Sequence, residues 1–270
     1  MPTVSINGAE LYHEVRGSGP PVLFIMGSTG DGGHFDALAD LLADEFTVIT
    51  YDRRGNGRSP APAGWTTTSP EEQADDAAAL VSSLALDPVA VVGTSSGGNF
   101  ALRMLTRHPA IVRGAVLHEP AVYALLEDFA AVRLPLQTVI RQAMAEGGSH
   151  LAVERFWQYI AGEDAWTELS PGLRERLCAS ARTLFDVELG TYELSLPDDR
   201  ALAAIAVPVL LVVSEDSHGF FAEVARRLSG RLDAEVATTP GRHGAYHDQP
   251  KALAETIRPF LREVSQLRTT

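Results

Sequence analysis

The chain has 270 residues, of which 45% are hydrophobic and 21% charged, which is enough for one large core or for one core with an inserted segment. Its formal net charge of −13 argues against nucleic acid or an anionic membrane as partners. The single cysteine, the lack of a signal peptide pattern at the start and the lack of a long apolar run together predict a cytoplasmic protein without disulfides.

The first elements are strands joined by glycine-rich turns. Asn7-Gly8 separates two alternating stretches, residues 3–6 and 10–15, and predicts a hairpin. A buried strand at residues 22–25 is followed by the glycine-dense loop 26–33 and by a helix at residues 34–43. The loop lacks the lysine and the spacing of nucleotide-binding loops, so we expect it to present the backbone N–H of Gly27 or Ser28 to an oxyanion instead.

The next strand, residues 46–51, is followed by a turn rich in charge and glycine, residues 52–59. Its Asp52-Arg53-Arg54 sequence could recognise an anion, but such turns more often fix their own backbone through side-chain hydrogen bonds, and we favour that role. Ser69-Pro70 followed by two glutamates predicts a capped helix that extends to about Leu86.

The strongest functional signal is Gly93-Thr94-Ser95-Ser96-Gly97. It follows the apolar strand 89–92 and opens a helix that ends before Pro109, which is the strand-turn-helix setting that a G-x-S-x-G nucleophile needs. Ser95 is therefore predicted as a nucleophile, and the amide of Ser96 at the helix start is predicted as an oxyanion donor. The alternative is a glycine- and serine-rich turn without chemistry.

The rest of the chain predicts an α/β fold with an insertion. Strand 112–117 leads to His118-Glu119, and residues 121–206 then carry only helical patterns, at 129–146, 150–161 and 171–185. Strand 207–213, helix 220–228, strand 234–238 and helix 250–267 follow. This alternation predicts a mainly parallel central sheet flanked by helices, with residues 1–120 and 207–270 as the core and 121–206 as a helical cap.

A serine nucleophile needs a base and an acid from elsewhere in the fold. His243 lies in the loop after the last strand, where the carboxyl ends of parallel strands meet, and His247 is its rival. Strand alternation directs His118 away from Glu119. Glu119 and Asp216 each follow a strand at the same sheet edge, so both are candidates for the acid.

These motifs resemble the α/β-hydrolase family over nearly the whole chain. The resemblance rests on an aromatic-Asp-x-Arg-Gly-x-Gly-x-Ser turn at 51–59, the elbow at 93–97, and a Gly-x-His followed by Asp248-x-Pro250. It implies Ser95 as nucleophile and His243 as base. The usual His-Gly oxyanion pair is Met26-Gly27 here, and the place where most members carry the acid is occupied by Ser217, one residue after Asp216.

The subgroup that contains zearalenone lactonases is similar in three further features. They are a G-x-S-S-G elbow, a His-Glu dipeptide after the next strand and a Pro-Gly-x-His loop. In that subgroup the glutamate is the triad acid, which implies Glu119 here and makes it the preferred acid over Asp216.

The sequence thus predicts a serine hydrolase that acts on a small-molecule carboxylic ester or lactone without cofactor or metal. C–C bond hydrolysis, amide or peptide cleavage and acyl transfer on the same triad are alternatives. A ligand receptor without catalysis is a further alternative from another class. As partners we expect neither nucleic acid nor membrane, and a homodimer stays open.

Overall fold

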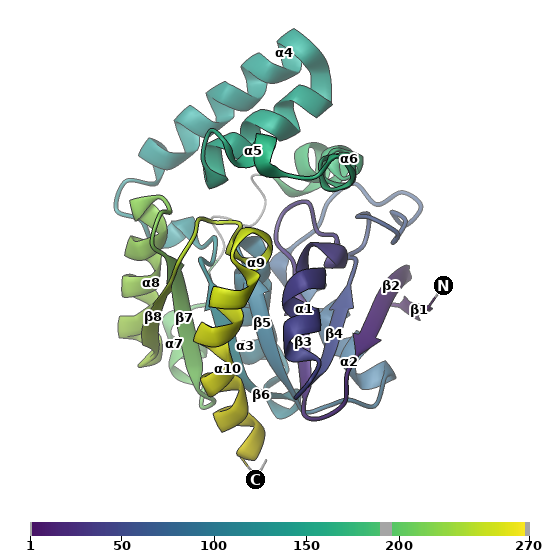
Figure 1. The fold of residues 1–270 in the computed structure, drawn as a ribbon, viewed down its shortest axis with the longest axis vertical. Coiled ribbons are helices and arrows are strands. Elements are labelled where there is room, and N and C mark those ends of the chain that lie inside the picture. The colour runs from purple at the N-terminus through teal and green to yellow at the C-terminus, as the bar shows by residue number, and fades with distance from the viewer. Residues whose placement is uncertain (1, 190–195, 268–270) are drawn as a thin grey trace.

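An eight-stranded sheet in the order β1-β2-β4-β3-β5-β6-β7-β8 forms the centre of the molecule in a computed structural model that describes residues 2–189 and 196–267 (Figure 1). The β1–β2 and β2–β4 pairs are antiparallel, and all later pairs are parallel, as predicted. The strands are β1 (Thr3–Ile6), β2 (Ala9–Arg16), β3 (Pro21–Ile25), β4 (Thr47–Tyr51), β5 (Val89–Thr94), β6 (Val112–His118), β7 (Val209–Ser214) and β8 (Glu235–Thr239).

Helices cover both faces of this sheet. The α-helices are α1 (Asp36–Leu42), α2 (Pro70–Ser83), α3 (Ser96–Arg107), α4 (Phe129–Ala161), α5 (Ala165–Glu168), α6 (Pro171–Ala179), α7 (Asp199–Ala203), α8 (Gly219–Leu232), α9 (Ala245–Asp248) and α10 (Pro250–Gln266). Shorter turns are η1 (Gly32–Phe35), η2 (Pro109–Ile111), η3 (Tyr123–Leu125) and η4 (Thr183–Glu188), of which the last is a π-helix.

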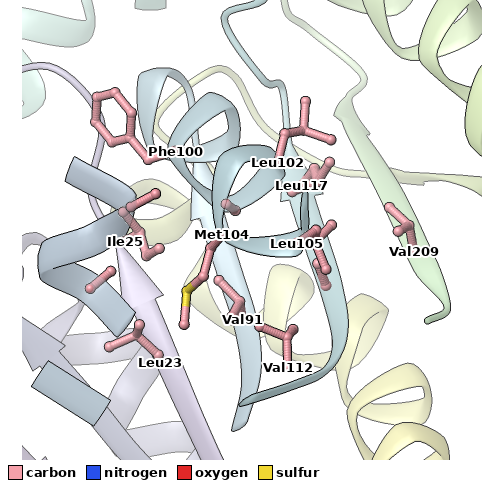
Figure 2. Packing of buried hydrophobic residues seen from close by; sticks show 14 of the residues in the cluster. Leu23, Ile25, Val91, Phe100, Leu102, Met104, Leu105, Val112, Leu117 and Val209 are labelled. Carbon is pink, nitrogen blue, oxygen red and sulfur yellow. The ribbon is translucent and has the colours of Figure 1, made fainter. Parts of the chain in front are cut away.

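Alternation along the strands divides the core into two layers. Leu23 and Ile25 of β3 pack with α2, α3 and α8, and Figure 2 shows this layer around Phe100 and Met104 of α3. The intervening residues of β3, Val22 and Phe24, pack with α1 and α10 on the other face. Both faces of the sheet are thus buried, which explains why the parallel strands are continuous apolar runs.

The structure differs from the predicted helices in the segment between β6 and β7. The two helices predicted at 129–146 and 150–161 follow one another directly in α4, with a break at Gly148, where φ is 75° and ψ is −164°. The helix predicted over 171–185 ends at Ala179, and a π-helical turn at 183–188 follows. That turn directs the buried Glu188 into the core, a tertiary contact that helical periodicity does not reveal.

Three helices of this segment, α4, α5 and α6, lie above one end of the sheet in Figure 1, whereas α7 lies beside the sheet next to α8. Apolar residues of α4 such as Phe156 and Trp157 belong to the same buried cluster as Phe35 and Tyr246 of the sheet-bearing part. Within residues 2–189 and 196–267, no helix has both the length and the apolar character needed to cross a membrane.

Candidate active site

The turn between β5 and α3 carries Ser95 in a strained conformation. Its φ of 54° and ψ of −126° lie outside the regions that residues with a side chain ordinarily occupy. Strand and helix approach so closely that a Cβ at Gly93 would overlap the carbonyl oxygen of Gly97, and a Cβ at Gly97 would overlap that of Ile25. Glycine at both places therefore permits this sharp turn, and the half-buried Ser95 lies at its tip.

The loop after β3 lies directly against this turn. A methyl group at Gly27 would lie 2.8 Å from Ser95 Cβ and 3.1 Å from the backbone nitrogen of Ser96. The hydroxyls of Ser28 and Ser96 are 3.1 Å apart. Ser96 is the first residue of α3, so its N–H has no partner within the helix. The three predicted oxyanion residues thus surround Ser95.

His243 and Glu119 form a buried pair beside Ser95. The Nδ1 of His243 lies 2.6 Å from Oε2 of Glu119, and because a carboxylate only accepts, this nitrogen carries the proton. The side chains are 2% and 0% exposed. Ser95 N donates to His118 O at 3.0 Å, so the serine and Glu119 lie at the ends of adjacent strands.

Two hydrogen bonds besides that of His243 hold the carboxylate of Glu119 in place. Its Oε1 accepts from the backbone N–H of Ser214 at 2.8 Å, and its Oε2 also accepts from the Ser217 hydroxyl at 2.9 Å. Burial alone would raise the pKa of Glu119, but its hydrogen bond and charge interaction with His243 and the hydrogen bond from the Ser214 N–H hold that pKa below its ordinary value. The carboxylate is therefore kept ionised and in place.

The alternative candidates for the acid and the base, Asp216 and His247, do not join the pair of Glu119 and His243. Asp216 is exposed, and its backbone N–H donates to Gly241 O at 3.0 Å. The ring of His247 stacks on Trp157 of α4 at 5.6 Å, and burial lowers the pKa of His247 to about 4. The structure thus pairs Glu119 with His243 at the strand end next to Ser95, and it leaves Asp216 and His247 outside this pair.

His118 lies beside the pair formed by Glu119 and His243. Its Nδ1 lies 2.9 Å from Thr94 Oγ1 and its Nε2 lies 2.9 Å from Ser214 Oγ, while its ring lies 6.3 Å from that of His243. Strand alternation does not extend to the next residue, because the chain leaves the extended conformation at Glu119, where φ is 44°. Both side chains consequently contact the surroundings of His243.

An aromatic wall and an apolar hollow adjoin the site. The ring of Phe221 stacks on His243 with centroids 4.3 Å apart and planes 8° apart, and the ring of Tyr123 lies 6.5 Å from that of Phe221. Tyr123 also lines a small apolar hollow of about 20 Å³, together with residues of α4 that include Phe129, Val132 and Leu136.

The histidine and carboxylate side chains near Ser95 are residue types that also bind metal ions. Across the described ranges, no three His, Cys, Asp or Glu side chains are placed to bind one ion.

Comparisons with known proteins agree with this architecture. Residues 20–143 match the model of the alpha/beta hydrolase fold family. The chain is 39% identical over 124 residues to the uncharacterized hydrolase YraK of Bacillus subtilis, a match that covers 46% of each chain. It is 28% identical to 2-(acetamidomethylene)succinate hydrolase of Mesorhizobium japonicum, over 96% of this chain and 94% of that one. Zearalenone hydrolase of Cladophialophora bantiana is 27% identical, over 94% of this chain and 95% of that one.

Among solved structures, a thermophilic esterase from Thermogutta terrifontis superimposes with a TM-score of 0.78 and 24% identity. The superposition covers 98% of this chain and 100% of the esterase. At this identity the likeness concerns the fold, which is the α/β-hydrolase fold that the sequence motifs predicted.

Proposed function

Because the chain belongs to the α/β-hydrolase superfamily, we propose that it is a serine hydrolase that cleaves carboxylic esters or lactones of small molecules. The observation that carries this proposal is the hydrogen bond of 2.6 Å between His243 and Glu119, at the strand end next to a serine in strained elbow geometry. The similarity to zearalenone hydrolase supports the ester or lactone class.

In the proposed acylation half, Ser95 Oγ attacks the substrate carbonyl carbon while Nε2 of His243 takes the hydroxyl proton. Glu119 accepts from Nδ1 of the ring and stabilises the imidazolium that forms. The negative oxygen of the tetrahedral intermediate accepts from the N–H of Ser96 and from that of Gly27 or Ser28. When the intermediate collapses, Nε2 donates its proton to the leaving alcohol, and the acyl group stays on Ser95.

In the proposed deacylation half, His243 removes a proton from water, and the resulting hydroxide attacks the acyl carbon. The same backbone N–H groups bind the second oxyanion. Collapse releases the carboxylic acid, and His243 returns the proton to Ser95 Oγ. Every proton taken is given back, so the cycle needs no cofactor.

Residues 121–206 are proposed to be a cap over this site. Helices α4, α5 and α6 of this segment lie above the sheet end at which β5 leads into α3, and residues of α4 line the apolar hollow beside Tyr123. An apolar acyl or aromatic part of the substrate would bind between the cap and the aromatic wall. We place the protein in the cytoplasm, because one cysteine in 270 residues suits a reducing compartment.

Amide cleavage on the same triad is the second candidate. The observation that favours it is the likeness to a hydrolase named for an acetamide-bearing succinate. The leaving group would then be an amine, which His243 would protonate in the same way. A panel of p-nitrophenyl esters, aromatic lactones and p-nitroanilides distinguishes the two substrate classes.

Labelling with a fluorophosphonate, followed by peptide mapping, tests the proposal. We expect a single modified residue, Ser95, and loss of ester hydrolysis in proportion to labelling. Ser95→Ala should lower kcat by about 10⁴-fold or more, because the nucleophile is lost. Ser82→Ala, at an exposed serine of α2, serves as the control and should leave labelling unchanged. A folded protein that is neither labelled nor active would contradict the proposal and favour a ligand receptor.

A further inference from the structure

Arg53 is a fully buried arginine beneath the loop that carries Gly27 and Ser28. Its side chain is 0% exposed, which is rare for arginine. Nε donates to the carbonyl oxygen of Met26 at 2.9 Å, and Nη2 donates to that of Gly27 at 2.8 Å. One guanidinium therefore binds two consecutive peptide carbonyls.

This arrangement dictates where the two neighbouring N–H groups point. Consecutive carbonyls of an extended chain point in opposite directions, but here both point at Arg53. In a trans peptide the N–H lies opposite to the C=O of the same plane. The N–H groups of Gly27 and Ser28 are thus turned to the side of the loop away from Arg53, and Gly27 itself lies against Ser95.

The remaining nitrogen of Arg53 links this loop to the inserted segment. Nη1 donates to Oε1 of Glu188 at 2.7 Å and to Oε1 of Gln73 at 3.0 Å. Glu188, which ends the π-helical turn η4, is 0% exposed and neutralises the buried charge. Only the planar fork of an arginine can serve these four oxygens in different directions, since a lysine is a single point charge.

We propose that Arg53 is a positioning residue for the oxyanion hole, which aims the N–H groups of Gly27 and Ser28 at the substrate oxygen. It does not touch the substrate. Through its ion pair with Glu188, Arg53 also makes the orientation of these N–H groups depend on the docking of the inserted segment. The oxyanion hole is therefore fully formed only when that segment is in place. The inference rests on the proposed serine hydrolase function.

The test compares two buried ion pairs. Arg53→Gln combined with Glu188→Gln removes the pair beneath the loop without leaving an unpaired charge. Arg54→Gln combined with Asp76→Asn removes a pair of similar burial, 2.6 Å between Nε and Oδ2, that lies away from the loop. Both variants are assayed well below their unfolding temperatures, with kcat, KM and the rate of fluorophosphonate labelling as readouts.

We expect the Arg53 variant to lose about 10²–10³-fold in kcat, as for loss of an oxyanion donor, with KM changed far less. Its labelling rate should fall in parallel, because phosphonylation also places an oxygen in the hole. The Arg54 variant should lose thermal stability but keep kcat within about threefold of the unchanged protein, since the oxyanion donors are intact.

Arg53→Lys gives a second readout if the double variant does not fold. It keeps a positive charge beside Glu188 but loses the fork, so kcat should fall by about tenfold or more while KM stays near its original value. Equal losses of kcat in the Arg53 and Arg54 variants, or an effect on KM alone, would overturn the inference. If the protein without substitutions is not labelled at Ser95, the proposed function itself is overturned. That outcome is distinct from a failure of the inference about Arg53.

Discussion

Glu119 shows how one residue acquires a defined role from its local geometry. Its positive φ turns the carboxylate out of β6 at the point where the strand ends. There it accepts from His243, from the Ser217 hydroxyl and from the backbone N–H of Ser214. A carboxylate with three donors is fixed in position and keeps the imidazole in one tautomer.

Replacement of this carboxylate by an amide tests the assignment. Glu119→Gln should lower kcat by about 10³–10⁴-fold, because the amide no longer stabilises the imidazolium and can present an N–H to the ring. Asp216→Asn, at the exposed rival, should keep kcat within about twofold. Ester hydrolysis at neutral pH measures both. A larger loss in the Asp216 variant would reverse the assignment of the acid.

Sequence motifs narrowed the acid to two residues, and only the geometry separates them. Both candidates follow strands that end at the same sheet edge, so position along the chain could not decide between them. Ser217 occupies the place where most family members carry the acid, and here its hydroxyl donates to Glu119 instead. The turn at 52–59 was predicted to fix its own backbone, but Arg53 instead bonds to Gly27 and Glu188, which are 26 and 135 residues away in sequence.

At the scale of the element, α2 depends on its first turn. The Ser69 hydroxyl accepts from the N–H of Glu72 at 3.1 Å, and Pro70 occupies the first helical position. The helix then presents Gln73 to Arg53 and Asp76 to Arg54. Its start therefore sets the position of two partners of the buried arginines.

Removal of this cap should destabilise the protein. Ser69→Ala is expected to lower the free energy of unfolding by about 1 kcal/mol, whereas Ser69→Asp should retain it, because aspartate also caps. Urea-induced unfolding measures the difference, with the exposed Ser82→Ala as a matched control. Equal free energies for Ser69→Ala and Ser69→Asp would show that the hydroxyl does not stabilise the helix.

Strands and well-capped helices were predictable because their signals are local: apolar runs, alternation, Ser-Pro-Glu starts. The segment between β6 and β7 was harder. Its π-helical turn at 183–188 replaces the end of a predicted helix, and the gain is the ion pair of Glu188 with Arg53. Such a contact outweighs helical preference only in the folded chain, so periodicity could not reveal it.

At the scale of the whole molecule, several histidines are buried in their neutral form. Burial lowers the pKa of His118 to about 4, despite a smaller upward effect of Glu119, and burial lowers that of His247 to about 4. Burial and the charge of Arg176 keep the pKa of His34 well below its usual value. In the unfolded chain all three would titrate near 6.5.

Stability should therefore fall in acid. Below pH of about 6.5 the unfolded chain binds more protons than the folded one, so the free energy of unfolding decreases as pH falls toward about 4. His118 alone accounts for a loss on the order of 2 kcal/mol between about pH 7.5 and pH 5. Urea titrations at several pH values measure this, and His118→Gln should flatten the dependence. His150→Gln, at an exposed histidine, should leave the slope as it is.

The position of the proposed acid, Glu119, after β6 also has a consequence for how this scaffold can diversify. Two groups at the end of β7 and after it bond to Glu119: the backbone N–H of Ser214, the last residue of the strand, and the hydroxyl of Ser217 in the loop. Any residue other than proline supplies the first of these groups. His218, the neighbour of Ser217, stacks on Tyr159 of α4 at 5.6 Å. Residues 215, 216 and 218 are therefore the natural positions for a directed-evolution library, where substrate preference can change while proton transfer is preserved.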